Sequence, residues 1–329
     1  MAKTKFLVSR YNAARDTKPY LQEFKLEIPQ GATLLDCINL IKWTQDGTLT
    51  YRMSCRSAIC GSCSMKVNGH ARLACKTQAA EAVIDGAITI EPMGNSPLIR
   101  DLVVDLEPFF DSIDRVKPFL VPDDSKQWKR ETLQSHDDYR KIEDASTCIM
   151  CASCWSDCNV LGVDPRFLGP AALAKAQRFV YDSRDNETRD RIEFLSRTTG
   201  MWDCTHCAEC ATRCPTDAKP LFRIKELRTA AMTYKITDNN GARHVLAFRE
   251  SVGGFLPGVG GGGLLNENYV PIRSVGFFNL DGILSLIPVG IRMIIRGKNP
   301  PILPHIIDKI GEVRAMFRRF NYYRKEYRK

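Results

Sequence analysis

The spacing of the cysteines constrains this chain more than any other feature. Twelve of its thirteen cysteines fall into three groups. The first follows C-x4-C-x2-C with a fourth cysteine after eleven further residues: Cys55, Cys60, Cys63 and Cys75. The other two groups share the pattern C-x2-C-x2-C-x3-C and are Cys148, Cys151, Cys154 and Cys158, then Cys204, Cys207, Cys210 and Cys214. An odd number of cysteines in a chain without an export signal argues for metal or redox chemistry and against a disulfide framework.

The spacing within each group predicts the cofactor that it holds. The first group has the plant-type spacing of a [2Fe–2S] cluster. In each repeated motif, three thiolates at i, i+3 and i+6 reach one cubane-type cluster, and the fourth, at the start of a helix, ligates the other cluster. The predicted pairing is therefore crossed: Cys148, Cys151 and Cys154 with Cys214, and Cys204, Cys207 and Cys210 with Cys158. Pro215 suits a first helical position. Structural zinc is the alternative, but it needs neither the third cysteine at i+6 nor the fourth at i+10.

Apolar and polar residues alternate around the first cysteine group and predict a small sheet. Half-buried strands are expected at 5–12 and 21–28. A helix capped by Thr33 follows, with apolar residues at helical spacing: Leu34, Leu35, Ile38 and Ile41. The ungrouped Cys37 lies in this helix and is predicted to be a buried small hydrophobic residue. Shorter strands are predicted at 65–68 and 87–91. Strand, strand, helix and cysteine loop is the order of a β-grasp ferredoxin domain.

The remaining patterns predict an α+β chain in three parts. Residues 101–140 carry helical patterning and then a charged connection, and residues 141–245 are mainly helical around the repeated motifs. We expect a β-grasp [2Fe–2S] domain over 1–105, an α-helical ferredoxin domain with two cubane-type clusters over 106–250, and a C-terminal extension over 251–329.

The C-terminal extension begins with a flexible linker, because seven glycines fall between Gly253 and Gly263. An apolar segment at 276–301 is interrupted by charges and proline, too often to span a bilayer. After Pro304, one predicted helical face carries Ile306, Ile307, Ile310, Val313, Met316, Phe317 and Phe320. Such a basic amphipathic helix docks on a partner or a membrane surface. An ordinary helix packed on its own domain is the alternative.

Charge is concentrated in this extension. The chain has a net charge of +9, and eleven basic and three acidic residues lie from Arg292 to Lys329. The rest of the chain is close to neutral, so the charge does not indicate a nucleic-acid-binding surface.

Two segments, SCRSAICGSCSMKVNGHARLAC and PLIRDLVVDLEPFFDSIDRVKPFL, resemble the iron–sulfur subunit of succinate dehydrogenase and fumarate reductase. With both cubane motifs in order, the resemblance covers roughly residues 1–245. It implies a β-grasp and an α-helical ferredoxin domain, and single-electron transfer between an FAD-bearing flavoprotein subunit and membrane quinone. Flavin chemistry then belongs to the partner chain, and no residue here is catalytic. We expect a peripheral membrane subunit, with the cytoplasmic face of the cell membrane as the default location; a signal-bearing partner that carries the chain across is the alternative.

Departures from the common family pattern point to a variant branch. Most members lack the cysteine that matches Cys207 and hold a [3Fe–4S] cluster; its presence favours a third cluster of the [4Fe–4S] type, with [3Fe–4S] if Cys207 is not a ligand. Residues 159–162 replace the proline and tryptophans that help to form the family's quinone pocket, so the quinone site would lie on the anchor or near the third cluster.

The tail, RGKNPPILPHIIDKIGEVRAMF, resembles the small iron–sulfur subunit of heterodisulfide reductases, which implies a cysteine-rich anchor. The alternative function is a component of a heterodisulfide or thiol:fumarate reductase. His206, inside the third group, either hydrogen-bonds a cluster sulfur or packs against the loop.

Overall fold

The computed structural model describes residues 3–123, 131–197, 199–253, 269–276, 279–298, 308–309, 311–317 and 319. The chain divides into two compact units, Met1–Tyr234 and Lys235–Lys329. Most of the predicted glycine-rich linker lies outside the described residues. So do four positions of the predicted tail helix: Ile306, Ile307, Ile310 and Phe320.

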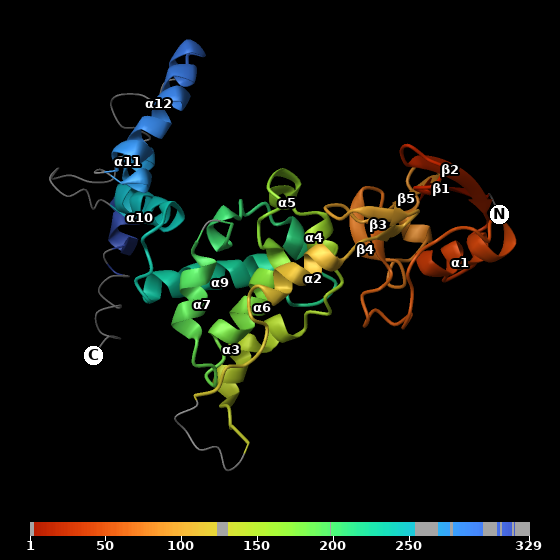
Figure 1. Cartoon of the computed structure of the whole chain (residues 1–329), viewed down its shortest axis with the longest axis horizontal. Coiled ribbons are helices and arrows are strands. Elements are labelled where there is room, and N and C mark those ends of the chain that lie inside the picture. The colour runs from red at the N-terminus through yellow and green to blue at the C-terminus, as the bar shows by residue number, and fades with distance from the viewer. Residues whose placement is uncertain are drawn as a thin grey trace. The chain divides into compact units, whose positions relative to one another are not determined.

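A five-stranded mixed sheet forms the N-terminal part of the first unit (Figure 1). Its strands are β1 (Thr4–Arg10), β2 (Tyr20–Leu26), β3 (Ser64–Val67), β4 (His70–Leu73) and β5 (Ala87–Glu91), in the order β2-β1-β5-β3-β4. Strand β1 pairs with β2 in antiparallel and with β5 in parallel orientation. A small second sheet joins β6 (Leu98–Arg100) and β7 (Val103–Val104). The four predicted strands are confirmed, and β4 was not predicted.

One face of the large sheet packs against helix α1 (Leu34–Thr44) to form a hydrophobic core. The alternation in β1 and β5 places Phe6 and Ile88 in this core with no exposed surface. Thr33 accepts a hydrogen bond from the backbone of Asp36, and the Asp36 carboxylate accepts one from the Thr33 backbone, so the predicted cap is confirmed as a capping box. Cys37 is fully buried as predicted, and burial raises the pKa of its thiol to about 11, with a contribution from Asp36.

Helices make up the rest of the first unit. They are α2 (Glu107–Asp114), α3 (His136–Ser146), α4 (Ser153–Ser156), α5 (Asn159–Val163), α6 (Gly169–Val180), α7 (Thr188–Leu195), α8 (Glu209–Thr212) and α9 (Pro220–Thr233), with 3-10 turns at Ala80–Ala82 and Met201–Asp203. Helix α6 is central: it packs against α2, α3, α4, α7 and α9. Its buried small residues allow this close approach, among them Gly169, Ala171, Ala172, Ala174 and Ala176.

The second unit contains α10 (Asn240–Gly253), α11 (Tyr269–Val275) and α12 (Leu280–Ile295). Helices α10 and α11 pack together, and Arg243 Nε donates a hydrogen bond to the Ser274 carbonyl at 3.0 Å. Residues 311–317 are helical, as predicted for that part of the tail. Within the described residues, we find no helix whose length and apolar character would suffice to cross a bilayer.

Candidate metal centres

The first cysteine group lies on a loop that leads into β3, with its fourth member just after β4. Backbone amides of this loop point at sulfur. Cys55 Sγ accepts hydrogen bonds from the amides of Ser57, Ile59 and Cys60, at 3.3–3.4 Å. Cys75 Sγ accepts one from Ala58 at 3.3 Å, and Cys63 Sγ one from Cys75 at 3.5 Å. All four cysteines therefore lie close together in a nest of N–H donors, which is the environment that stabilises metal-bound thiolates.

The two sides of this first group differ in electrostatics. Cys60 is exposed, and hydrogen bonds from Ser62 and from the Cys55 amide lower the pKa of its thiol to about 6. Cys63 is buried, and burial raises the pKa of its thiol to about 12. Because metal ligation requires the thiolate, the buried side depends on the charge of a bound metal to ionise. The exposed side faces the protein surface.

The two repeated motifs fold into matching loops. The residue before the second cysteine of each motif has a left-handed backbone conformation. Its φ is 53° at Met150 and 59° at His206. Ala152 and Ala208 are also left-handed and precede the short helices α4 and α8. Equal spacing thus produces an equal backbone. The motifs differ at their fourth cysteine: Cys158 caps α5, as predicted, whereas the predicted helix at Pro215 is wrong.

A turn replaces that predicted helix after Cys214. The Thr216 hydroxyl lies 3.5 Å from Cys214 Sγ and accepts a hydrogen bond from the Ala218 amide. The left-handed Lys219 (φ 36°) ends this turn, and α9 begins at Pro220. The side-chain hydrogen bonds of Thr216 compete with helix formation at this position, so the proline that suits a first helical turn is Pro220 rather than Pro215.

The structure brings together the four thiols that the crossed pairing predicted for the first cubane-type cluster. One pocket is lined by Cys148, Cys151, Cys154 and Cys214. Burial raises the pKa of Cys154 well above its usual value, and the neighbouring thiols raise it further. Burial also raises the pKa of Cys148, an effect that the charge of Lys175 opposes.

The third set of thiols is likewise assembled across the two motifs. Burial raises the pKa of Cys158, and electrostatic interactions with Cys204 and Cys207 add to the shift. Burial raises the pKa of Cys210 to about 12, and the same neighbours and Cys158 contribute. Cys207 is exposed, which the cysteines of the middle set are not. The middle set thus has no exposed cysteine, and the third set reaches the surface through Cys207.

Arg228 of α9 organises the loop of the third set, and the sequence patterns did not single it out. Its guanidinium donates hydrogen bonds to the carbonyls of Met201, Trp202 and Cys204, at 2.7–3.1 Å. Its Nη1 also lies 2.7 Å from His206 Nε2. Burial and then the charges of Arg228 and Lys225 lower the pKa of His206, so the imidazole is neutral and accepts from Arg228. His206 is therefore engaged by an arginine through Nε2, and its two predicted roles at the third thiol set stay predictions.

The first cysteine loop touches the first repeated motif directly. Gly61 has a φ of +73°, and a Cβ added there would lie 2.7 Å from the Cys151 Cα. That separation is shorter than any tolerable contact, so only glycine fits. Ser64 Oγ lies 3.4 Å from Ser153 Oγ at the same junction. The first and second thiol sets therefore sit on loops in van der Waals contact.

Asn95 holds the other side of this junction. Its side-chain amide donates to the carbonyls of Trp155, Ser156 and Cys158, at 2.8–3.1 Å, and Trp155 Nε1 donates to the Asn95 carbonyl at 2.8 Å. The Trp155 and Cys158 carbonyls also accept backbone hydrogen bonds from the Cys158 and Gly162 amides, so Asn95 adds a second hydrogen bond to each of them. An asparagine far from both motifs in sequence thus fixes the link between the second and third thiol sets.

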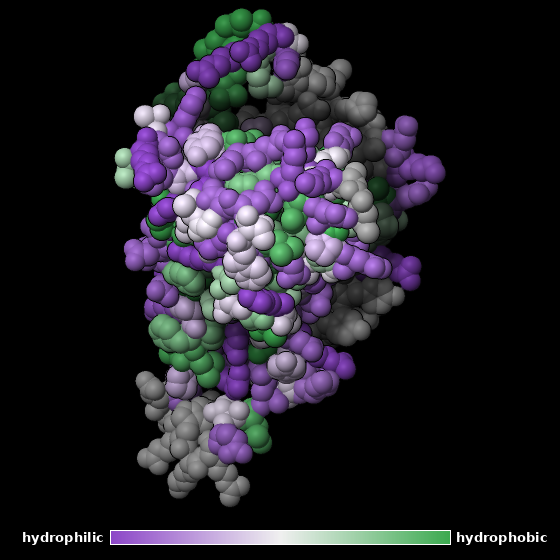
Figure 2. Space-filling view, turned by 90° about the vertical axis from the view of Figure 1, so that its right-hand side faces the viewer, coloured by the Kyte–Doolittle hydropathy of each residue, from purple (hydrophilic) through white to green (hydrophobic). Residues whose placement is uncertain are grey.

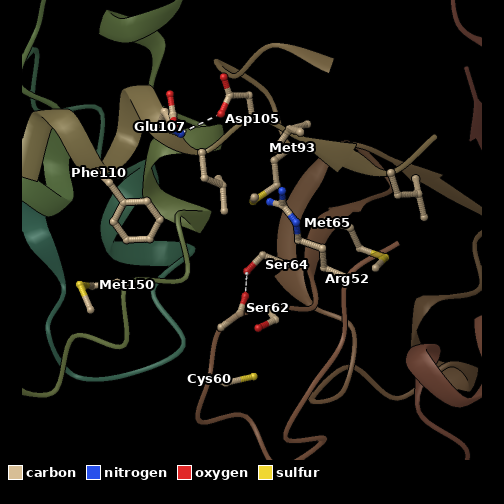
Figure 3. Close-up of a pocket in the computed structure, with 14 residues that line it drawn as sticks. Arg52, Cys60, Ser62, Ser64, Met65, Met93, Asp105, Glu107, Phe110 and Met150 are labelled. Carbon is tan, nitrogen blue, oxygen red and sulfur yellow. Dashed lines mark hydrogen bonds between the residues drawn. The ribbon is translucent and has the colours of Figure 1, made fainter. Parts of the chain in front are cut away.

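A cleft opens between the sheet and the helices beside the first set (Figure 3). Cys60 and Met150 line it from the first loop and the first repeated motif, and Arg52 and Phe110 reach it from different sides. The first thiol set therefore borders a surface depression with both charged and apolar walls.

A fourth group of potential ligands lies where β4 meets α8. Ligand atoms of His70, Asp157 and Glu209 are all within 4.8 Å of one another. Arg213 donates to Glu209 at 2.9 Å, lies 3.2 Å from an Asp157 oxygen and contacts His70 Nδ1 at 2.8 Å. Its guanidinium forms ion pairs with both carboxylates, so the group links the sheet to the helices by polar contacts.

The chemical type of the ligands in the three thiol sets is the one that iron–sulfur clusters require. Each predicted set consists of four thiols, and amide N–H groups point at the sulfurs of the first set. Structural zinc sites combine two pairs of ligands and do not need the crossed assembly seen here. The twelve cysteines therefore remain our predicted ligands in the three predicted sets.

Comparisons with known proteins agree with this architecture. A family described as "2Fe-2S iron-sulfur cluster binding domain" matches residues 5–111, and one described as "4Fe-4S dicluster domain" matches residues 144–218. The fumarate reductase iron-sulfur subunit of Mycobacterium tuberculosis is 40% identical over 233 residues, which cover 70% of this chain and 93% of that protein. The succinate dehydrogenase iron-sulfur subunit of Coxiella burnetii is 34% identical and is covered over 95% of its length, with 68% of this chain.

A solved structure supports the fold. A chain of the Mycobacterium smegmatis Sdh1 complex in the apo form superimposes with a TM-score of 0.63 at 28% identity, covering 71% of this chain and 98% of that chain. The predicted fold class, a [2Fe–2S] ferredoxin domain with a mixed sheet followed by a helical [4Fe–4S] region, is confirmed.

Proposed function

Because the chain belongs to the family of iron–sulfur subunits of fumarate reductases and succinate dehydrogenases, we propose that it conducts single electrons between a flavoprotein subunit and the quinone pool. Bound clusters would supply one-electron redox couples whose potentials depend on cluster type, hydrogen bonds to sulfur and burial. The observation that carries the proposal is the serial order of the thiol sets. The first contacts the second at Gly61 and Cys151, and the second and third share both repeated motifs.

The exposure of the cysteines indicates where partner proteins can approach the two ends of this series. Cys60 of the first set and Cys207 of the third are exposed, and no cysteine of the middle set is. A series with an exposed cysteine at each end and none in the middle suits transfer between two different partners. We assign the FAD-bearing flavoprotein to the end with Cys60, and the membrane anchor to the end with Cys207.

We assign a [4Fe–4S] cluster to the third set, with Cys158, Cys204, Cys207 and Cys210 as ligands. The support is that the charge of Cys207 acts on the thiols of both Cys158 and Cys210, as expected for neighbouring ligands of one cluster. Arg228 and Lys225 add positive charge at this loop. Positive charge beside a cluster favours its reduced form, so Arg228 would raise the potential of the third cluster.

We further propose that the chain is a peripheral subunit at the cytoplasmic face of the cell membrane. A cysteine-rich anchor subunit would hold it, with the quinone on that anchor close to the third cluster. Residues 159–162 support this placement of the quinone, because they begin a short helix with small and aliphatic side chains rather than an aromatic wall. Protease accessibility in inverted and right-side-out vesicles tests the membrane face.

Electron paramagnetic resonance of the anaerobically purified complex tests the main proposal. We expect succinate to reduce the clusters, and fumarate to reoxidise them after dithionite treatment. An oxidised sample without a strong near-isotropic [3Fe–4S] signal, with interacting [4Fe–4S] signals on reduction, supports ligation by Cys207. Clusters that respond to thiols with fumarate, but not to succinate, would instead indicate the thiol-linked reductase.

A further inference from the structure

Helix α12 of the second unit carries one narrow polar stripe on a surface that is otherwise mainly apolar. At 100° per residue, one stripe carries Leu280, Leu284, Ile287, Ile291, Ile294 and Ile295. The other stripe carries Asp281, Ser285, Arg292 and Arg296. The Asn279 side chain caps the helix by accepting a hydrogen bond from the Gly282 amide. The charges that interrupt this apolar segment in sequence therefore collect on one side of the helix.

The apolar stripe of α12 is uncovered in the described part of the chain. No residue of α12 is buried. Exposure of the apolar stripe ranges from 48% at Ile287 to 77% at Ile295. Figure 2 colours each residue by hydropathy and shows hydrophobic residues scattered among hydrophilic ones on the face in view. Helices of globular proteins bury such a stripe, and apolar patches of this extent mark interaction sites.

The length and charge of α12 favour a lipid surface as the occupant. Sixteen residues span roughly 24 Å, less than the ~30 Å hydrocarbon core of a bilayer. Asp281 and Arg292 lie within the helix and on the polar side, which suits a helix lying in the plane of the interface. Arg292, Arg296 and the following Lys298 are exposed and cluster at the C-terminal end. Long arginine side chains beside an apolar stripe can extend to phosphate groups while their stems cover hydrocarbon.

We propose that α12 lies in the interface of a bilayer containing anionic lipids, with its apolar stripe among the acyl chains and Arg292, Arg296 and Lys298 against lipid phosphates. The contact belongs to this chain itself and adds to any contact made by anchor subunits. It goes beyond the electron-transfer role and does not depend on it.

Vesicle flotation of the full chain, loaded with its clusters, tests the proposal. We expect the chain to float with vesicles of phosphatidylcholine and phosphatidylglycerol, and to remain unbound with phosphatidylcholine alone. Ile287→Asp places a charge in the apolar stripe and should weaken binding at least about tenfold. Ser285→Asp is the matched control, because it introduces the same side chain on the polar stripe. It should retain more binding than Ile287→Asp by about fivefold or more.

The cationic end of α12 has its own test. Arg292→Gln and Arg296→Gln should each weaken binding to the anionic vesicles about fivefold, the effect of one surface cation, and added salt should weaken wild-type binding. The visible absorption of the clusters should be unchanged in every variant, which excludes misfolding as the cause. Wild-type chain that floats with neither vesicle overturns the proposal. So does an Ile287→Asp variant that keeps its vesicle binding but loses its co-purifying subunits, because the stripe would then be a protein interface.

Discussion

The two repeated cysteine motifs have the same spacing and the same left-handed backbone positions, yet they lie in different surroundings. The loop of the first contacts the sheet domain at Gly61 and lines a pocket whose cysteines are buried or half-buried. The loop of the second carries the exposed Cys207 and is held by Arg228. The motif therefore determines what can be bound, and the neighbours determine where electrons can enter or leave. Four experiments test this difference.

Removing the second cysteine of each motif should give the largest contrast. Cys151→Ala should lose the first cubane-type cluster and several kcal/mol of stability, because ligation pins a loop between two packed domains. Cys207→Ala should retain three iron atoms at the third site, with a near-isotropic [3Fe–4S] signal in the oxidised state, and an intact fold. Iron analysis, paramagnetic resonance and thermal unfolding measure these outcomes, and each kcal/mol lowers the Tm by about 2–4 °C. A purified Cys151→Ala variant with full iron content would contradict the contrast.

The contact between the first loop and the first motif predicts the next effect. Gly61→Ala places a Cβ 2.7 Å from the Cys151 Cα and should cost about 1–3 kcal/mol beyond the backbone strain. It should also weaken the magnetic interaction between the first two reduced clusters, as the loops are forced apart. Gly69→Ala is the matched control: its φ is +81°, but nothing lies within 4 Å of the added atom. Equal Tm values for the two variants would show that the loops can separate without cost.

Ligand spacing is a local property, which explains why the sequence predicts the thiol sets and the strands well. The same kind of local pattern carries two further signals. Asn68–Gly69 is a hairpin signal, and both residues have positive φ between β3 and β4. In α12, the spacing of the charged residues predicts the helix surface better than their number does, because Asp281 and Arg292 fall on one stripe.

Local sequence patterns could not predict the roles of Arg228 and Asn95 at the cysteine loops. Arg228 lies 24 residues after Cys204 in the middle of α9, and Asn95 lies 60 residues before Trp155. Only the packing of α9 against the 3-10 turn and of the sheet against α4 brings them to the cysteine loops. An arginine in a helix and an asparagine in a loop have no distinctive local pattern, so their role requires the tertiary structure.

Charge beside each motif should adjust one cluster and leave the other unchanged. Arg228→Gln should lower the potential of the third cluster by on the order of 50 mV, because a nearby positive charge that favours the reduced state is lost. Lys175→Gln should lower the potential of the first cubane-type cluster, since Lys175 acts on Cys148. Redox titration followed by paramagnetic resonance separates the two. Arg228→Lys should restore part of the potential, whereas a purely structural role for Arg228 predicts no such rescue; equal shifts of both clusters in either variant would contradict the comparison.

Substitution of Asp182 should have the smallest effect on the difference between the two motifs, since this residue acts on the first motif only through α6. Its carboxylate is buried and accepts hydrogen bonds from Arg178 and Arg184, at 2.6–2.8 Å. Burial opposes its ionisation, but the bonds from Arg184 and Arg178 outweigh burial and lower its pKa to about 2. Asp182→Asn should therefore cost about 1–3 kcal/mol, the loss of hydrogen bonds to a charged group.

The pH dependence of this cost follows from the direction of the pKa shift. A native pKa below the unfolded value of about 3.9 means that the fold binds the ionised carboxylate more tightly. This stabilisation is complete above about pH 5 and is lost only as the pH falls through the native pKa. The Tm difference between the wild type and Asp182→Asn should thus be constant from about pH 5 to about pH 8, a range well above both pKa values. A difference that shrinks as the pH falls within this range would mean that Asp182 titrates with a raised pKa, and that burial rather than its two arginines dominates at the end of α6.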